Sequence, residues 1–384
     1  MRKVAIVGGK TSEFRKGTEI SVNHIALESA VNLLKETGFP RNLIDAVIIS
    51  SCSSDQYLSS IIAEMLGIKP KISHRLDNLC NSGTNAIISG FSYISSGICD
   101  SALIIGVEKP STLGRVLSSD LSRGQFTLPI YWGAIFKKIH MKKYETTEEQ
   151  ICTVPVNNYL KANKNKTAFN KNKTINLEQV LNSRILVEPL KLLECCSICE
   201  GSSSILLVAE EKIPFFKSKV IHNKKNSGEL IPVLIKGIGQ QTNSASFGNS
   251  LMDIFDQGPA KIAARQAYKM AKISPKDIDI AEIHDAFSIL EIMGYEDLEF
   301  VKKGEGGKFV NQNNIAVNMR GGIIGCGHPI GVTGIAQTVE VFEQLIGRSS
   351  HKLQQLKKSS VSNKGIVHNL AAAGTSASVL ILEK

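Results

Sequence analysis

The sequence predicts an α/β fold in which helices cover both faces of a mostly parallel sheet. Two observations carry this prediction. Short runs of aliphatic residues, each the length of one buried strand, alternate with segments whose apolar residues recur at helical spacing. The order of these elements in the second half of the chain echoes their order in the first half, which indicates an internal duplication.

In the first half we expect four buried strands and three helices. The strands are predicted at residues 4–9, 44–50, 100–106 and 202–209. The helices are predicted at residues 22–35, 58–66 and about 80–97. Gly38 and Pro40 end the first of these helices, because glycine caps a helix in a left-handed conformation and proline cannot continue it.

In the second half the same pattern returns. Strands are predicted at residues 232–237, 277–283, 365–369 and 376–382, with a helix at residues 334–346. A duplicated α/β unit commonly places its active site where the two halves meet, outside the strand ends. We therefore expect the functional residues in the loops at those ends.

Residues 113–201 interrupt this pattern, because aliphatic runs become rare there and the composition turns polar. The spacing of Thr147 and Gln150 is typical of a capping box, and residues 163–173 are predicted to form an exposed loop of Lys and Asn. We predict three parts: an N-terminal half at 1–112 with a return strand at 202–209, an inserted lid-like subdomain at 113–201, and a C-terminal half at 202–384.

The composition excludes several classes of protein. With 42% hydrophobic and 21% charged residues among 384, the chain is typical of globular proteins that bury a sizeable core. No apolar run is long enough to span a bilayer, and the start of the chain leads directly into a strand rather than a signal peptide. We therefore expect a cytoplasmic protein without a membrane partner, whose eight cysteines are free thiols.

The net charge of +10 favours a partner that carries phosphates. The basic residues gather between Arg115 and Lys191 and between Lys212 and Lys225. They form no single arm and are not interleaved with aromatic residues, so we expect a nucleotide-like ligand and no nucleic acid.

Cys80 is the leading candidate nucleophile. It lies in the stretch Leu79 to Ala86, just before apolar residues at helical spacing, and so at the start of a buried helix. The unpaired N–H groups and the positive end of a helix dipole stabilise a thiolate there, which is the reactive form of cysteine. The alternative is a small buried hydrophobic residue, since free cysteine is often buried and inert.

Three further polar clusters fall at predicted strand or helix ends. They are His284-Asp285-Ala286-Phe287, the glycine-rich loop 321–334 with Cys326 and His328, and the turn at 368–374. A cysteine, a base and backbone donors together suit acyl transfer through a thioester. A metal hydrolase built from His284, Asp285, Cys326 and His328 of the first two clusters is conceivable. The cysteines at 195–199 lack the second pair typical of zinc sites, and core packing is favoured for them. We expect no metal.

These motifs resemble those of thiolases, in particular the sterol-carrier-protein type and its archaeal acetoacetyl-CoA relatives. The matching motifs are the loop at Cys80, His284-Asp285-x-Phe287, Gly327-His328-Pro329-x-Gly331 and His368-Asn369-Leu370. The resemblance covers essentially the whole chain, including the insert. It implies a thiolase fold, with duplicated βαβαβαββ halves in a five-layered αβαβα arrangement and an inserted loop subdomain.

The resemblance also implies roles for single residues. Cys80 would take the acetyl group from acetyl-CoA, and His328 would accept its proton and then help bind the thioester oxygen of the second acyl-CoA. His284 would share that oxyanion hole. The backbone N–H groups of Cys80 and Gly374 would form a second hole for the acetyl-enzyme oxyanion. The insert would cover coenzyme A, with its basic residues near the phosphates.

The sequence departs from the family at the second catalytic cysteine. Many thiolases carry it in the last glycine-rich turn, here Leu370 to Gly374, and some relatives carry it where Ala286 stands. Cys326, two residues before His328, is the remaining candidate for an acid or base at the α-carbon, and its flanking glycines would let it face the pocket. Alternatively, Cys326 fills space and the second step is weak or lost. Glu200 stands where relatives usually have aspartate.

The expected function is that of an acetyl-CoA C-acetyltransferase, which condenses two acetyl-CoA to acetoacetyl-CoA or cleaves it in reverse. The resemblance implies a role in mevalonate and isoprenoid synthesis, coenzyme A thioesters as substrates, and no further cofactor. It also implies a homodimer or tetramer, with 3-hydroxy-3-methylglutaryl-CoA synthase and a small OB-fold protein as partners. A weak or silent CoA-binding scaffold is one alternative. A ketosynthase-like condensing enzyme is another, but the His284 and Gly-His-Pro motifs argue against it.

Overall fold

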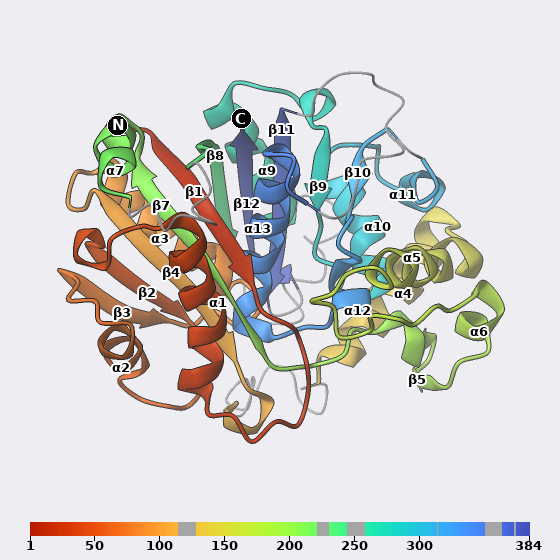
Figure 1. Cartoon of the computed structure of the whole chain (residues 1–384). Coiled ribbons are helices and arrows are strands. Elements are labelled where there is room, and N and C mark those ends of the chain that lie inside the picture. Colours follow the sequence, from red (N-terminus) through yellow and green to blue (C-terminus); the bar gives the residue numbers. More distant parts are fainter. Residues whose placement is uncertain (114–127, 221–229, 244–257, 313, 350–362, 372–373) are drawn as a thin grey trace.

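The computed structural model describes residues 1–113, 128–220, 230–243, 258–312, 314–349, 363–371 and 374–384. The strands of the first half are β1 (Val4–Thr11), β2 (Ala46–Ser50), β3 (Ile72–Leu76), β4 (Ser101–Glu108) and β7 (Gly201–Ala209). Those of the second half are β8 (Val233–Thr242), β9 (Ile280–Glu282), β10 (Ala316–Val317), β11 (Lys364–Ala371) and β12 (Ser376–Glu383). They form one sheet in the order β10-β9-β11-β12-β8-β1-β7-β4-β2-β3 (Figure 1).

The two halves of this sheet repeat one pattern. Outward from the central contact of β1 with β8, each half has two antiparallel pairs followed by two parallel pairs. The expectation of a mostly parallel sheet is therefore wrong, because the sheet is mixed. β11 and β12 show why strands pair in an antiparallel manner here. The connection between Ala371 and Ser376 is short, whereas a parallel pair needs a much longer crossover.

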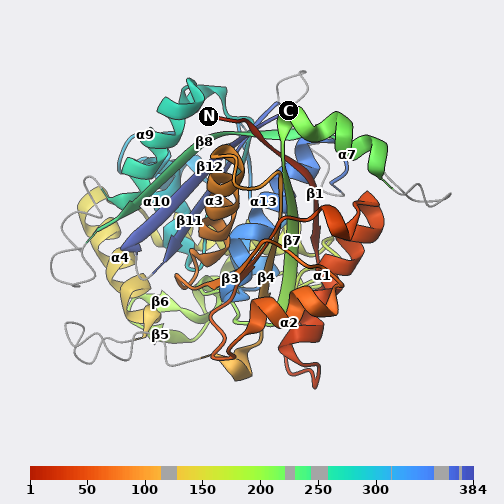
Figure 2. The same ribbon diagram turned by 90° about the vertical axis from the view of Figure 1, so that its left-hand side faces the viewer.

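The two halves of the sheet form two layers, and helices lie between them and on their outer faces. The molecule therefore has five layers, α-β-α-β-α, as the resemblance implies. The outer helices on the first half are α1 (Val22–Thr37) and α2 (Leu58–Met65), the central ones are α3 (Ser82–Ser95) and α13 (Thr333–Leu345), and those on the second half are α9 (Pro259–Ala271) and α10 (Ser288–Asp297). Three apolar clusters fill the spaces between these layers. Figure 2 shows α1 and α2 on one side of the molecule and α9 and α10 on the other.

The two central helices touch through their backbones near their N-terminal ends. A Cβ atom on Gly83 would lie 2.8 Å from the backbone nitrogen of Ile335, and one on Gly334 would lie 2.6 Å from that of Thr84. Only glycine permits such an approach. As a consequence, the loops that precede the two helices are brought together, one from each half of the chain.

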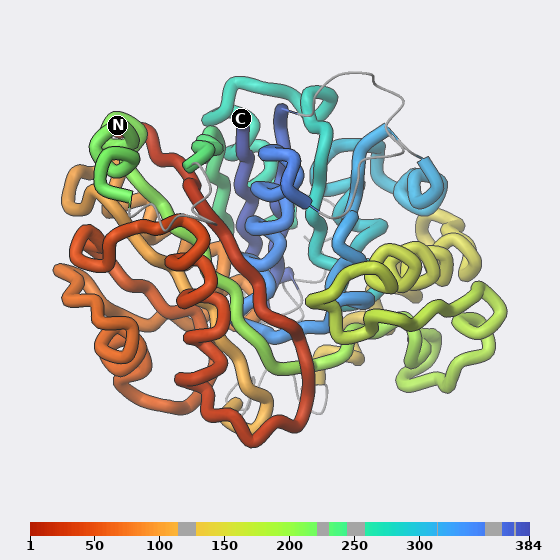
Figure 3. The backbone as a smooth tube through the Cα atoms, in the orientation of Figure 1, coloured from red at the N-terminus to blue at the C-terminus, as the bar shows by residue number. Residues whose placement is uncertain are grey.

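The insert lies beside the second half of the sheet. Its elements are α4 (Pro129–Tyr144), α5 (Glu148–Ala162), α6 (Leu177–Leu181), β5 (Ile185–Val187) and β6 (Leu190–Lys191). In Figure 3, which has the orientation of Figure 1, the chain returns from the insert along β7. The predicted capping box is present, because Thr147 and Gln150 exchange hydrogen bonds at the start of α5. The remaining helices are α7 (Ile213–Lys219), α11 (Gly306–Phe309) and α12 (Gly322–Cys326).

The prediction of an exposed loop at 163–173 is partly wrong. Asn165 and Asn170 are buried, and their side-chain amides donate to the backbone oxygens of Arg320 and Ile324 at 3.0 and 3.2 Å. The asparagines therefore satisfy carbonyl groups around α12 instead of facing water. Among the described residues, no helix has the length and apolar character needed to cross a bilayer.

Candidate active site

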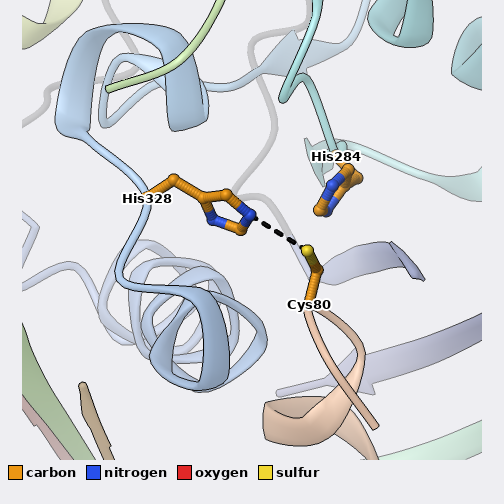
Figure 4. Close-up of side chains that lie close together, drawn as sticks. All are labelled: Cys80, His284 and His328. Carbon is orange, nitrogen blue, oxygen red and sulfur yellow. Dashed lines mark hydrogen bonds between the residues drawn. The ribbon is translucent and has the colours of Figure 1, made fainter. Parts of the chain in front are cut away.

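Cys80, His284 and His328 converge where the two halves meet. Cys80 immediately precedes the cap of α3, His284 follows β9, and His328 lies between α12 and α13. The Cys80 sulfur and one ring nitrogen of each histidine lie within 4.8 Å of one another (Figure 4). The two imidazole rings meet edge to face, with their centroids 5.6 Å apart. The structure thus assembles three of the predicted site residues.

His328 is arranged as a base for Cys80. Its Nε2 atom lies 3.1 Å from the Cys80 sulfur, and its Nδ1 atom lies 2.7 Å from the Thr333 hydroxyl. That hydroxyl donates its single proton to the Pro329 carbonyl oxygen at 3.2 Å, so it accepts a hydrogen bond from His328. The hydrogen-bond network therefore assigns the proton to Nδ1 and leaves Nε2 free to accept the Cys80 proton.

His284 has the opposite tautomer. The side-chain amide of Asn369 donates to Nδ1 of His284 at 3.3 Å and to Oε1 of Gln337 at 2.7 Å. With Nδ1 acting as an acceptor, the proton of the neutral ring lies on Nε2. The two histidines therefore present different groups to a substrate, one acceptor and one donor. Asn369 belongs to the third predicted cluster, and its side chain explains why that cluster adjoins the site.

Burial keeps all three side chains neutral. It lowers the pKa of His328 to about 4, and burial together with the neighbouring His328 and His368 lowers the pKa of His284 well below its ordinary value. Burial also raises the pKa of Cys80 to about 12, an effect that a backbone hydrogen bond only partly offsets. The predicted thiolate is therefore wrong for the resting site. A neutral thiol faces a neutral imidazole, and its proton leaves as the sulfur attacks.

The nucleophile loop is fixed to the opposite half of the sheet. The side-chain amides of Asn81 and Asn85 donate to the hydroxyl groups of Ser376 and Ser378 on β12, at 3.1 and 2.9 Å. Leu79 adopts a left-handed backbone conformation, with φ at 49°, just before Cys80. These contacts hold the sulfur in one position relative to the histidines of the second half.

Glu108 is a buried carboxylate that sequence analysis did not select. It lies at the end of β4 and accepts hydrogen bonds from the backbone N–H groups of Cys52 at 3.2 Å and Gly331 at 2.8 Å. Burial raises its pKa to about 7. Glu108 therefore joins the first half of the chain to the loop that carries His328. The signal in the sequence is a charged residue that ends an otherwise apolar strand.

A second buried hydrogen-bond network joins the insert to the loops that carry His284 and His328. Asp285 accepts hydrogen bonds from the backbone N–H of Ile324 at 3.2 Å and from the side chain of Asn158 on α5 at 2.8 Å. The same Asn158 amide donates to Glu291 at 2.7 Å. Gly322 has φ at +60°, and a Cβ atom there would lie 2.2 Å from the Asp285 carboxylate. No motif in the sequence marks Asn158 as part of the site.

Cys326 lies outside the group around Cys80. Its side chain is fully buried, its thiol donates to the Arg320 carbonyl oxygen at 2.9 Å, and Asn165 donates to its sulfur at 3.4 Å. It packs with Ala162 and Ala168 of the insert. The expectation that flanking glycines turn this thiol towards the pocket is therefore wrong. Its role as the base stays a prediction, which no contact with Cys80, His284 or His328 supports.

Gly374 lies in the turn that leads into β12. Its φ of 78° is in the left-handed region that favours glycine. It borders an apolar pocket with Leu290, Met293 and Leu370. Two residues later, Ser376 binds Asn81 of the nucleophile loop, so the turn is fixed close to that loop. The predicted second oxyanion hole, made by the N–H groups of Gly374 and Cys80, stays a prediction.

The assembled residues have the chemistry of metal ligands as well as that of a catalytic pair. Zinc binds cysteine sulfur and histidine nitrogen, and the three atoms around Cys80 are close enough to hold one ion. Among the described residues, this is the single group of its kind, and the cysteines at 195–199 do not form one. Metal analysis of purified protein tests the prediction that the enzyme needs no metal.

Comparisons with known proteins agree on one family. The family model described as "Thiolase, N-terminal domain" matches residues 4–211, and that described as "Thiolase C-terminal domain-like" matches residues 239–384. The acetyl-CoA acetyltransferase of Methanothermobacter thermautotrophicus is 32% identical over 403 residues, which cover 100% of both chains. Sterol carrier protein 2 of Gallus gallus is 26% identical over 97% of this chain and 70% of its own.

Solved structures share the fold. The structure described as "Ltp2-ChsH2(DUF35) aldolase" has a TM-score of 0.83 at 22% identity, covering 99% of this chain and 97% of that one. Acetyl-CoA acetyltransferase from Syntrophomonas wolfei has a TM-score of 0.77 at 17% identity, covering 100% and 99%. Together with the two domain matches and the full-length archaeal relative, these results show that the chain belongs to the thiolase family.

Proposed function

We propose that this chain is an acetyl-CoA C-acetyltransferase, which condenses two acetyl-CoA to acetoacetyl-CoA or cleaves acetoacetyl-CoA in reverse. As a thiolase it is an acyltransferase, and its full-length relative at 32% identity is named an acetyl-CoA acetyltransferase. The observation that carries the proposal is the contact of Nε2 of His328 with the Cys80 sulfur at 3.1 Å, because it joins a nucleophile to an unprotonated base.

The geometry suggests the order of events in acyl transfer. The Cys80 sulfur attacks the thioester carbonyl carbon while its proton passes to Nε2 of His328. The oxyanion that forms would be held by the backbone N–H groups of Cys80 and Gly374. The bond between the carbonyl carbon and the coenzyme A sulfur then breaks, coenzyme A leaves with the proton that His328 had accepted, and an acetyl group remains on Cys80.

In the second step, the binding of the second acetyl-CoA, the tautomers of His284 and His328 give the two residues different roles. In the resting site, His284 offers an N–H donor for the thioester oxygen of the second acetyl-CoA. His328 can add a second donor only while it carries the proton taken from Cys80. We therefore assign the greater share of that oxyanion hole to His284, and the role of base to His328.

The pathway and the partners are part of the same proposal. We propose a role in mevalonate and isoprenoid synthesis, as the resemblance to archaeal acetoacetyl-CoA thiolases implies; two archaeal relatives are named acetyl-CoA acetyltransferases. A fold neighbour described together with a DUF35 protein supports a small partner protein, which we propose to be an OB-fold protein beside 3-hydroxy-3-methylglutaryl-CoA synthase. We further propose a cytoplasmic homodimer or tetramer.

Some of the basic residues of the insert form ion pairs within the insert itself. Lys137, for example, is buried, and its ammonium nitrogen lies 2.8 Å from the Glu194 carboxylate.

Cleavage of acetoacetyl-CoA by free coenzyme A tests the function. We expect the wild type to form acetyl-CoA and the Cys80→Ala variant to form none above background. Coenzyme A binding, measured by calorimetry on both proteins, separates the alternatives. Binding by both with cleavage by neither would favour the silent scaffold.

A further inference from the structure

Asn318 lies where the chain turns from strand β10 towards the loop that carries His328. β10 pairs in parallel with β9, and the backbone N–H of Asn318 donates to the Ala281 carbonyl oxygen at 2.8 Å. At Asn318 the backbone is left-handed, with φ at 47°. Its carbonyl oxygen accepts the N–H of Gly321 at 2.9 Å, which closes a turn. The backbone ladder between β9 and β10 therefore ends at Asn318.

The side chain of Asn318 replaces the next bond of that ladder. In a regular parallel pair, the carbonyl oxygen of Asn318 would accept the N–H of Ile283. That carbonyl is turned towards Gly321, and the side-chain Oδ1 accepts the Ile283 N–H at 2.7 Å instead. Asparagine suits this position because it tolerates the left-handed conformation and carries an amide oxygen on a short side chain. The backbone beyond β9 is thereby held up to Ile283, the residue before His284.

A buried carboxylate fixes the orientation of the Asn318 amide. Its Nδ2 atom donates to Oε2 of Glu291 at 2.7 Å, and Glu291 also accepts hydrogen bonds from Asn158 and from the Tyr295 hydroxyl. One partner of the amide is an N–H donor and the other is a carboxylate, so the positions of its oxygen and nitrogen follow from the network. Asn318 is 0% exposed and Glu291 is 2% exposed, and both bonds are therefore shielded from water.

We propose that Asn318 is a positioning residue for His284, acting through the backbone of Ile283. This inference rests on the proposed acetyltransferase function, in which the N–H at Nε2 of His284 binds the thioester oxygen of the second acetyl-CoA. The ring itself is held by the Asn369 amide through a hydrogen bond of 3.3 Å, which is long. The backbone that precedes His284 therefore has a large share in deciding where Nε2 lies.

Loss of the side-chain bond would free the backbone next to His284. The Ile283 N–H is buried, and a buried donor without a partner is costly, so we expect this backbone to shift towards another acceptor. A displacement of about 1 Å at a catalytic group can lower a rate by about 10²-fold. The backbone bonds of Asn318 to Ala281 and Gly321 do not involve its side chain, so the strand pairing and the turn can persist in a variant.

Two substitutions at Asn318 separate positioning from stability. Asn318→Gly keeps the left-handed backbone and removes both side-chain bonds. Asn318→Asp keeps an oxygen acceptor for the Ile283 N–H but places a second carboxyl group against Glu291, which makes burial more costly. Tyr295→Phe is the matched control, because it also removes one donor from Glu291 but leaves the Ile283 bond intact. Each variant is measured at neutral pH for Cys80 acetylation, acetoacetyl-CoA cleavage and urea unfolding.

We expect Asn318→Gly to lower kcat for cleavage by about 10- to 100-fold, with KM and the rate of Cys80 acetylation within about threefold of the wild type. Asn318→Asp should be the less stable variant but the more active one, because it keeps the bond to Ile283. Tyr295→Phe should cleave at close to the wild-type rate. In the His284→Ala background, Asn318→Gly should lower cleavage by less than about twofold, because no imidazole remains to be positioned.

The position of the His284 ring can also be followed without turnover. Its imidazole proton signals in an NMR spectrum, assigned by their absence from His284→Ala, should shift or broaden in Asn318→Gly and stay in place in Tyr295→Phe. Unchanged signals, equal losses of cleavage with and without His284, or the same order of the two Asn318 variants in stability and in activity would overturn the inference. A wild type that never acetylates Cys80 would instead refute the acetyltransferase function, whereas the NMR comparison would still test the position of His284.

Discussion

The two halves of the molecule share one architecture but contribute different chemistry. Each half has the same succession of strand pairs and places one helix, α3 or α13, in the central layer. The loop before α3 carries Cys80, and the loop before α13 carries His328. The duplicated fold thus brings the nucleophile and its base face to face from corresponding places in the two halves. The comparison teaches that neither half holds a complete site.

The second half also supplies the remaining polar groups. His284 and Asn369 come from it, whereas the first half adds Glu108, which binds the Gly331 N–H behind the site. Cys80 and His328 come from different halves but act in the same step, whereas His284 comes from the same half as His328 and acts in another. The following variants test that division of work.

The largest effect is expected for His328→Ala. This change removes the acceptor of the Cys80 proton, and without an acceptor the proton stays on the thiol, because the pKa of Cys80 is raised to about 12. We expect both Cys80 acetylation and acetoacetyl-CoA cleavage to fall by about 10²- to 10⁴-fold. Rapid-quench peptide analysis with acetyl-CoA measures the first rate. Acetylation at the wild-type rate would show that His328 is not the base.

A smaller effect, confined to one step, is expected for His284→Ala. The variant loses the N–H donor for the second thioester oxygen, and such a loss typically lowers turnover by about 10²- to 10³-fold. Acetylation of Cys80 should stay close to that of the wild type, because His328 and Thr333 are untouched. Equal losses in acetylation and in carbon–carbon cleavage would contradict the separate roles of the two histidines.

A further variant, Asn158→Ala, tests the tie between the insert and the second half. It leaves the buried Asp285 and Glu291 carboxylates each without one donor, which costs about 1–3 kcal/mol of unfolding free energy. We expect cleavage to fall about tenfold or less, since Asn158 acts only by positioning the histidine loops. Urea unfolding and steady-state assays measure both effects. The half-buried neighbour Asn157→Ala is the control and should change neither.

The smallest effect on activity is expected for Glu108→Gln, which is best detected through stability. Because burial raises the folded-state pKa of Glu108 to about 7, the folded protein binds more protons than the unfolded chain between about pH 4.5 and 7. The contribution of Glu108 to the free energy of unfolding therefore falls as pH rises through that window, by on the order of 2–3 kcal/mol.

The difference between wild type and Glu108→Gln isolates this effect. Buried histidines such as His328, whose pKa is lowered, give the opposite slope, since they lose stability as pH falls. Urea unfolding of both proteins at several pH values measures the difference. A difference that is independent of pH between 4.5 and 7 would contradict the raised pKa.

Much of the fold could be predicted from the sequence, because long buried strands and amphipathic helices have clear patterns. The strands at residues 46–50, 101–108 and 201–209 overlap their predictions closely. The strands β3 and β10 were not predicted. β3 is not buried and β10 has only two residues, so neither forms an extended apolar run.

The site could be predicted only in part. The reactive residues Cys80, His284 and His328 lie in recognisable sequence motifs. Their protonation states, however, depend on contacts that are made only after folding. The predicted thiolate fails because desolvation outweighs the helix dipole, and the placement of Cys326 fails because a flanking glycine allows a turn without fixing its direction.

The central claim is that Cys80 carries the acyl group, with His328 as its base. Incubation of the wild type with acetyl-CoA, followed by digestion and peptide mass spectrometry, tests it most directly. We predict one acetyl group, on the peptide that contains Cys80, which disappears when free coenzyme A is added and forms far more slowly in His328→Ala. An acetyl group on another cysteine, with Cys80 unmodified, would contradict the account.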